Sequence, residues 1–141
     1  MTEPTDLQIR NILTGVKTVA LVGWSPDPTR PSHGVAEVLR RRGIRVLPVN
    51  PGQAGRDWQG ERVRASLADC AGEGVGMVDV FRRSDAVAGI VTEMLANLPE
   101  ARVLWLQLGV GDPAAEARAE AAGVTVIANR CPAIEIRRLG L

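Results

Sequence analysis

The chain has 141 residues, of which 45% are hydrophobic and 23% are charged, a composition that fits a single folded domain over residues 1–141 and excludes a disordered chain. Its 17 basic residues nearly balance its 16 acidic ones. The formal net charge of +1 argues against a protein that binds nucleic acid through a broad basic surface. Because no apolar run is long enough to span a membrane and no leader sequence is recognisable, we expect a cytoplasmic protein with no membrane partner.

The first half of the chain alternates helical patterns with short apolar runs. The predicted elements are a helix capped by Thr5 or Asp6, with Leu7, Ile9, Ile12 and Leu13 as its buried side and Gly15 as its end; a strand over residues 18–22; a polar loop from Gly23; a helix with Val35, Val38 and Leu39 that ends near Gly43; and a strand over residues 44–49. Asn50-Pro51-Gly52 then signals a turn. We predict a loop anchored by Trp58 over residues 53–61 and a weak helix over residues 65–71.

The second half repeats the alternation of strand and helix. The predicted elements are a strand over residues 76–81; a helix capped by Ser84-Asp85 with Val87, Ile90, Val91, Met94, Leu95 and Leu98 as its apolar side; a strand over residues 102–108; a helix opened by Asp112 and Pro113 that ends at Gly123; a strand over residues 124–128; and a short helix around residues 134–139. Near-continuous apolar strands joined by helices indicate a parallel sheet that is buried on both faces.

These elements predict an α/β fold, a three-layer, Rossmann-like, doubly wound parallel sheet of about five strands. With the strands numbered along the chain, we favour the order 3-2-1-4-5 over the flavodoxin-like order 2-1-3-4-5. The favoured order places the ligand crevice between the carboxyl ends of strands 18–22 and 102–108. The strand, glycine turn and helix N-terminus around Gly23 are expected to present backbone N–H groups to a phosphate.

The residues at the strand ends can bind a ligand but offer little for catalysis. They are Gly23-Trp24-Ser25, Asn50-Pro51, Phe81-Arg82-Arg83, Gln107-Leu108-Gly109 and Asn129-Arg130-Cys131-Pro132. They contain no evident acid–base pair and no metal cluster, and the single His33 argues against a Cys/His metal site. A dinucleotide site is disfavoured because G-x-G-x-x-G is missing and Asn50, rather than an acid, follows the second strand.

Five motifs at the strand ends together resemble one family. They are V-G-x-S with the distal Arg30, P-V-N-P (residues 48–51), D-V-F-R (residues 79–82), W-L-Q-x-G (residues 105–109) and R-C-P-A-I-E (residues 130–135). Over residues 7–139 the chain resembles the small, single-domain CoA-binding proteins, relatives of the N-terminal domain of the succinyl-CoA synthetase alpha subunit. The resemblance implies a Rossmann-like fold that binds coenzyme A. It does not carry ligase activity over, because the synthetase's second domain and phosphohistidine segment have no counterpart here.

The resemblance also assigns parts of the ligand to residues. Gly23, Trp24, Ser25 and Arg30 would meet the phosphates; Val49, Asn50 and Pro51 the adenosine end; and Phe81, Arg82, Gln107, Leu108 and Gly109 the pantetheine path. Cys131 is either a small buried residue or a thiol that faces the thiol end of CoA, and Cys70 is expected to be inert.

The leading hypothesis from the sequence is therefore a non-catalytic protein that binds CoA or an acyl-CoA. The alternatives are an NAD(P)-binding, oxidoreductase-like domain and a CoA-dependent enzyme or subunit that acts with a partner. A homo-oligomer is also compatible with the sequence. We expect Asp79, inside the third strand, to pair with a nearby donor.

Overall fold

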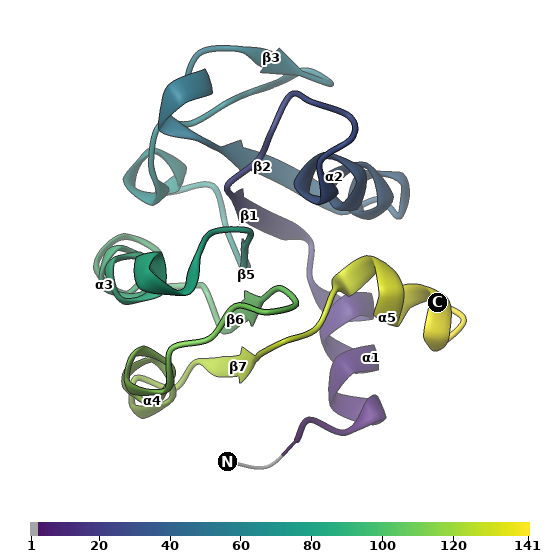
Figure 1. The fold of residues 1–141 in the computed structure, drawn as a ribbon, viewed down its shortest axis with the longest axis vertical. Helices are drawn as coiled ribbons and strands as arrows, with labels where there is room; N and C mark the ends of the chain where they lie inside the picture. The colour runs from purple at the N-terminus through teal and green to yellow at the C-terminus, as the bar shows by residue number, and fades with distance from the viewer. Residues whose placement is uncertain (1–2) are drawn as a thin grey trace.

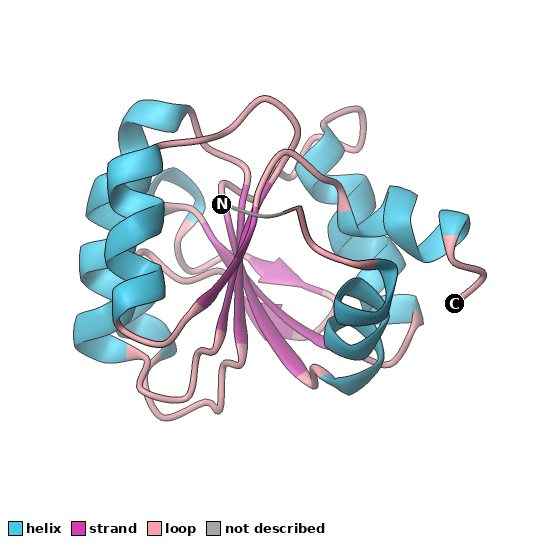
Figure 2. Cartoon of the chain, turned by 90° about the horizontal axis from the view of Figure 1, so that it is seen from below, coloured by secondary structure: helices cyan, strands magenta, loops and turns pink. Residues whose placement is uncertain are grey.

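The computed structural model describes residues 3–141 as a parallel five-stranded sheet with helices on both faces (Figure 1 and Figure 2). The α-helices are α1 (Asp6–Gly15), α2 (Pro31–Arg41), α3 (Val87–Asn97), α4 (Pro113–Ala121) and α5 (Pro132–Arg138). The sheet contains β1 (Thr18–Val22), β2 (Arg45–Val49), β5 (Met77–Val80), β6 (Val103–Leu106) and β7 (Thr125–Ile127). A small hairpin of β3 (Asp57–Trp58) and β4 (Glu61–Arg62) and the 3₁₀ turns η1 (Pro51–Gln53), η2 (Leu67–Cys70) and η3 (Ser84–Ala86) complete the fold. The predicted fold class is confirmed.

The strand order is β2-β1-β5-β6-β7, so the order 3-2-1-4-5 that we favoured from the sequence is wrong and the flavodoxin-like alternative is right. The physical reason lies at the outer edge of β2. Arg64 N–H donates to Pro48 O at 2.9 Å, and Asn50 N–H donates to Arg64 O at 2.9 Å, so the segment after the hairpin occupies that edge. β5 therefore pairs with the free side of β1, and the crevice opens between β1 and β5 rather than between β1 and β6.

A cluster of charged side chains holds this segment in place. Arg64 is 5% exposed, and its guanidinium donates to Glu73 at 2.8 Å and to Glu61 at 3.2 Å. Arg45 on β2 donates to the same two carboxylates at 3.2 Å and 2.8 Å. The two arginines hold the pKa values of Glu61 and Glu73 below their usual range, so these contacts stabilise the ionised carboxylates.

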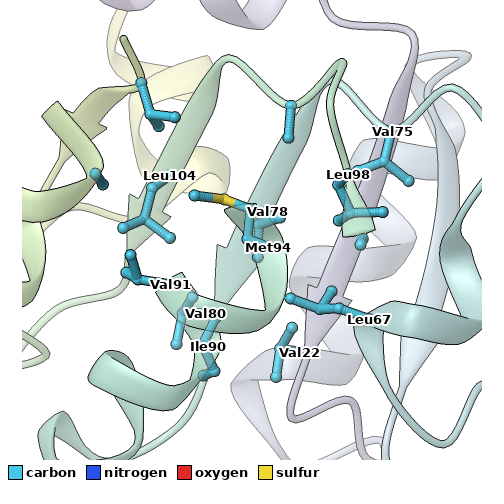
Figure 3. Close-up of a cluster of buried hydrophobic side chains, with 14 of the residues drawn as sticks. Val22, Leu67, Val75, Val78, Val80, Ile90, Val91, Met94, Leu98 and Leu104 are labelled. Carbon is cyan, nitrogen blue, oxygen red and sulfur yellow. The ribbon is translucent and has the colours of Figure 1, made fainter. Parts of the chain in front are cut away.

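The two faces of the sheet carry two separate apolar cores. On one face, Val78, Val80 and Leu104 of the strands pack against Val91 and Met94 of α3 (Figure 3). On the other face, side chains of α1, α2 and α5 cover the alternate strand residues, among which are Leu21, Met77 and Trp105. Successive residues of a strand point to opposite faces, so each strand contributes to both cores, which is why the strands read as continuous apolar runs.

Most helix ends follow the sequence, and two details differ. Thr5 caps α1 in a capping box with Gln8, and Asp112 caps α4, as predicted. Leu7, predicted to be buried, is 66% exposed because it lies on the solvent side of the first turn of α1. Ser84 and Asp85 form η3 instead of capping α3, whose first residue follows Ala86.

The connection between β2 and β5 is less helical than predicted. The weak helix expected over residues 65–71 is reduced to the 3₁₀ turn η2, and Trp58 anchors the hairpin with 6% of its surface exposed. Among residues 3–141, no helix combines the length and apolar character needed to cross a bilayer.

Candidate functional site

A cavity of about 670 Å³ opens at the carboxyl ends of β1, β5 and β6, beside the start of α2. This size falls in the range of small-molecule and cofactor sites. Its lining residues are Gly23, Trp24, Ser25, Arg30, Pro31, Ser32, Asn50, Phe81, Arg82, Arg83, Gln107, Leu108, Gly109 and Val110. Four segments that are far apart in the sequence thus meet where a doubly wound sheet places its ligands.

Ten of the thirteen residues predicted from the sequence line this cavity: Gly23, Trp24, Ser25, Arg30, Asn50, Phe81, Arg82, Gln107, Leu108 and Gly109. The structure does not bring Val49, Pro51 or Cys131 to it. The sequence reasoning missed Pro31, Ser32 and Val110, and it placed Arg83 at a strand end without assigning it a part of the ligand. The signals for them were present: Pro31 is the first residue of a helix, and Arg83 follows a residue already chosen.

The cavity lining is cationic. It includes Arg30, Arg82 and Arg83 and contains no aspartate or glutamate. Arg83 reaches Asp85 only at 3.6 Å with both side chains exposed, and within residues 3–141 neither Arg30 nor Arg82 forms an ion pair. Unpaired arginines at a concave surface favour a ligand with phosphate or carboxylate groups, which the guanidinium fork binds with two hydrogen bonds.

The N-terminus of α2 adds a second attraction for anions. Arg30 is the N-cap residue, but its side chain makes no capping hydrogen bond. Pro31 has no N–H, and in the part of the chain that the structure describes no backbone or side-chain acceptor satisfies the N–H of Ser32. The positive end of the helix dipole therefore faces the cavity with an unsatisfied donor, which is the arrangement that binds phosphate groups at helix starts.

The glycine turn after β1 offers fewer donors than we expected. The N–H groups of Gly23 and Trp24 both donate to Val49 O, at 2.9 Å and 3.2 Å. The sequence pattern indicated a turn that presents these groups to a ligand, and the structure uses them to join the turn to β2. The prediction is therefore wrong for the backbone N–H groups of these two residues, although both residues line the cavity.

Side-chain amides fix the loops around the cavity. Asn50 donates from Nδ2 to Trp24 O at 2.8 Å and accepts at Oδ1 from Gly52 N–H at 2.9 Å, so its amide is already engaged. Asn129, at a φ of 58°, accepts the N–H of Gly109 at 2.8 Å. Asn tolerates this left-handed conformation better than other side chains do, and here the conformation holds the loop after β6 in place.

The lining also contains apolar side chains, and two buried polar groups lie in the strands that end at the cavity. Phe81, Leu108 and Val110 supply the apolar surface, and Leu108 is 56% exposed. Gln107 is 7% exposed, and its Oε1 has no hydrogen-bond partner in residues 3–141. Asp79 is fully buried, neither of its carboxyl oxygens has a partner there, and burial raises its pKa well above the usual range. The prediction that Asp79 pairs with a nearby donor is wrong.

The two thiols differ in surroundings, and neither lines the cavity. Cys131 is 7% exposed and packs in the core under α5, so its predicted contact with the thiol end of a ligand stays a prediction that this geometry does not favour. Burial raises the pKa of the Cys70 thiol to about 11, which agrees with the expectation that it is inert. His33 donates from Nδ1 to Ser25 O at 2.9 Å, and its ring lies 5.9 Å from the Trp24 ring, so both contacts help to position the loop before α2.

Comparison with known proteins identifies the family. A family model described as a CoA binding domain matches residues 17–137. The chain belongs to this CoA-binding family. An uncharacterised protein of Bacillus subtilis, YneT, is 34% identical over 131 residues, which is 93% of each chain. A Thermus thermophilus protein of known structure is 40% identical, covers 96% of this chain with 99% of its own, and superposes with a TM-score of 0.89.

A more distant solved structure has the same fold over part of its chain. The dinucleotide-forming acetyl-coenzyme A synthetase 1 of Ca. Korarchaeum cryptofilum matches 82% of this chain with 26% of its own, at 20% identity and a TM-score of 0.68. At this identity the match shows a shared fold. The CoA-binding family that the strand-end motifs indicated is confirmed by the family model, and the match to the synthetase shows that the two proteins share a fold.

Proposed function

We propose that the protein binds coenzyme A or an acyl-CoA in the cavity at the carboxyl ends of β1, β5 and β6, without changing the ligand chemically. The observation that carries the proposal is the cavity's lining, which combines three arginines and no acidic residue with the apolar side chains of Phe81, Leu108 and Val110. CoA has the matching asymmetry, because its phosphates are clustered at the adenosine end and its pantetheine arm is long and carries only two amides.

The lining supports an orientation of the ligand. Arg30, Arg82 and the N-terminus of α2 suit the phosphates, since together they provide charged forks and an unsatisfied backbone donor. Phe81, Leu108 and Val110 suit the pantetheine arm. The adenosine end of the ligand then lies beside the end of β2, near Asn50. Val49 and Pro51 flank Asn50 in the sequence but do not line the cavity.

The same lining supports binding rather than catalysis. It contains two serines but no histidine, cysteine, lysine or carboxylate, so no side chain there can act as a general base for a hydroxyl nucleophile. The bound thiol or thioester would be held at the rim near the exposed Leu108, where a partner subunit or a second copy of this chain can reach it. We also propose that the protein acts in the reducing environment of the cytoplasm.

Calorimetric titration of the purified protein tests the proposal directly. We expect saturable binding of CoA and acetyl-CoA, and binding of NAD and NADP at least tenfold weaker. Like CoA, NADP contains an adenosine diphosphate with one further ribose phosphate, at the 2′ rather than the 3′ position, but it lacks the pantetheine arm, so it separates phosphate recognition from recognition of the whole ligand. Tight binding of NADP together with indifference to CoA would replace the proposal with the dinucleotide-binding alternative, and conversion of acetyl-CoA during the titration would show an enzyme.

Removing one cation from the cavity should weaken CoA binding measurably. Arg30→Ala and Arg82→Ala are each expected to raise the Kd for CoA by about 5- to 150-fold, because a charge-assisted hydrogen bond contributes roughly 1–3 kcal/mol. Arg137→Ala is the matched control, since Arg137 is an exposed arginine of α5 outside the cavity. An unchanged Kd in both cavity variants would show that these arginines do not hold the phosphates.

A further inference from the structure

Asp79 and Gln107 are buried polar side chains that the fold leaves without partners. Asp79 is 0% exposed and Gln107 is 7% exposed, and the structure shows no hydrogen bond to either Asp79 carboxyl oxygen or to Gln107 Oε1 within residues 3–141. A buried polar group without a partner carries a free-energy cost of about 1–3 kcal/mol. Both groups belong to neighbouring segments of the sheet, β5 and the residues just after β6, so we asked whether they can be partners of each other.

The strand register places both side chains on the same face of the sheet. Asp79 of β5 pairs with Trp105 of β6, and Gln107 N–H donates to Val80 O just beyond these strands. Gln107 follows Trp105 by two residues and therefore points to the face that Trp105 and Asp79 share. The two side chains are offset by one strand and two residues, about 7 Å along the strand. With the spacing of about 4.8 Å between neighbouring strands, the two Cα atoms are about 8 Å apart, which a Gln and an Asp side chain can span when they are directed toward each other.

The surroundings of Asp79 hold no opposite charge for it. On this face β1 and β6 contribute apolar side chains, α1 contributes Ile9 and Leu13, and the buried residues of α2 are not titratable. Glu135 of α5 is the buried titratable group of the covering helices, and its two carboxylate oxygens are occupied by Arg130 and Arg138. Burial is accordingly the cause of the raised pKa of Asp79, and the group remains neutral well above the pH at which an exposed aspartate ionises.

We propose that the carboxylic acid of Asp79 donates a hydrogen bond to Oε1 of Gln107, and so fixes the Gln107 amide with its NH₂ group toward the cavity. A protonated carboxyl has one O–H donor, and Oε1 is an unpartnered acceptor that faces inward. The NH₂ group is then the end of the amide available to a ligand, where it can donate to a carbonyl oxygen. Asp79 is in this sense a positioning residue, because it acts on the ligand through Gln107.

The arrangement makes ligand binding sensitive to the proton on Asp79. When Asp79 releases its proton to solvent, its carboxylate only accepts hydrogen bonds, so the Gln107 amide turns its NH₂ group inward and its carbonyl toward the cavity. Two carbonyl oxygens then face each other. Because this step rests on the proposed function, we identify the ligand group as an amide or thioester carbonyl of the pantetheine arm, which runs past Phe81 and Leu108 in the orientation above.

The experiment that tests the hydrogen bond uses ligand-free protein. In ¹⁵N-labelled protein, the side-chain NH₂ signals of Gln107 are assigned by their loss in Gln107→Met and compared between the parent, Asp79→Asn and Asp79→Ala. Asn keeps a donor at position 79 at every pH, whereas Ala has none. We expect the Gln107 signals of Asp79→Asn to stay near the parent positions and those of Asp79→Ala to move. Identical Gln107 signals in the parent and Asp79→Ala would overturn the proposal.

CoA titrations with the same variants test the consequence for the ligand. Asp79→Ala and Gln107→Met are each expected to weaken binding about 2- to 10-fold, and the double variant no more than either alone, since both remove one hydrogen-bond chain. The parent should lose affinity as the pH rises through the ionisation of Asp79, and Asp79→Asn should lack this loss. Additive effects of the two substitutions would contradict a shared chain of hydrogen bonds from Asp79 through Gln107 to the ligand. If the parent does not bind CoA at all, the proposed function fails, while the NMR comparison still decides the hydrogen bond.

Discussion

Replacing Gly23 by alanine should destabilise the protein by about 2–5 kcal/mol and abolish ligand binding. Gly23 has a φ of 90°, and an added Cβ would lie 2.5 Å from Phe81 O and 3.2 Å from Arg82 Cδ. An L-residue in the left-handed region costs roughly 1–2 kcal/mol, and overpacking adds about 1–3 kcal/mol. The obstructing atom is a backbone carbonyl, so relief requires β1 and β5 to separate exactly where the cavity opens.

Gly43→Ala is the control that isolates the clash. Gly43 has a φ of 86°, but no atom lies within 4 Å of its added Cβ, so only the backbone strain of about 1–2 kcal/mol applies. Urea unfolding of both variants gives the two free energies of unfolding, and CoA titration gives the effect on the site. Equal destabilisation by the two substitutions would show that the contact between Gly23 and the carbonyl of Phe81 does not limit the size of the side chain.

The location of the cavity could be predicted from the sequence because the carboxyl ends of a parallel sheet are where ligand crevices form. The carboxyl ends of parallel strands lie at one edge, so residues such as Ser25, Phe81 and Gln107 had to approach each other once the strands were recognised. The Pro31 helix start and the unpaired arginines lay in the same segments. Strand boundaries alone therefore predicted most of the cavity lining, even though the strand order was wrong.

What the sequence left open depends on contacts between distant residues. The strand order turned on the segment around Arg64, which reaches the outer edge of β2 only after folding into a hairpin. The donors of the Gly23 turn were lost to Val49 O for a similar reason, since local turn chemistry does not reveal a carbonyl on the neighbouring strand. Cys131 was placed at the site from its position after a strand, but α5 packs it into the core.

Asp79 illustrates the limit most clearly. A charged residue inside an apolar run is ordinarily expected to have a partner, because burial of an unpaired charge is costly. The strand instead places it at the centre of the sheet with no cation near it, where it avoids the cost by remaining protonated. The core adjoins the cavity next to this residue, since Phe81, two residues further along the same face, lines the cavity.

The stability of the protein should therefore depend on pH in a way that Asp79→Asn removes. The folded-state pKa of Asp79 is raised above its unfolded value of about 3.8, so the folded state binds the proton more tightly. This contribution is fully present below the unfolded pKa and is lost as the pH rises toward the folded pKa, at about 1.4 kcal/mol per pH unit. Asparagine has the shape of the protonated acid but does not titrate. The difference in the free energy of unfolding between Asp79→Asn and the parent should therefore grow at this rate above pH 4.

Glu73→Gln provides a control with the opposite sign. Arg64 and Arg45 lower the pKa of Glu73, so the stability that its carboxylate contributes is present above the unfolded pKa and is lost as the pH falls through the folded pKa. The destabilisation caused by Glu73→Gln should accordingly shrink in acid, where the parent loses the same ion pairs. The stability advantage of Asp79→Asn over the parent should also shrink in acid, because there Asp79 is protonated in the unfolded state as well as in the folded state. Urea unfolding of the three proteins from about pH 2 to about pH 8 measures both trends, because the Glu73 contribution is lost only below its unfolded pKa of 4.5. A difference between Asp79→Asn and the parent that stays constant across this range would show that Asp79 titrates normally, and that its carboxylate finds a stabilising partner in solution.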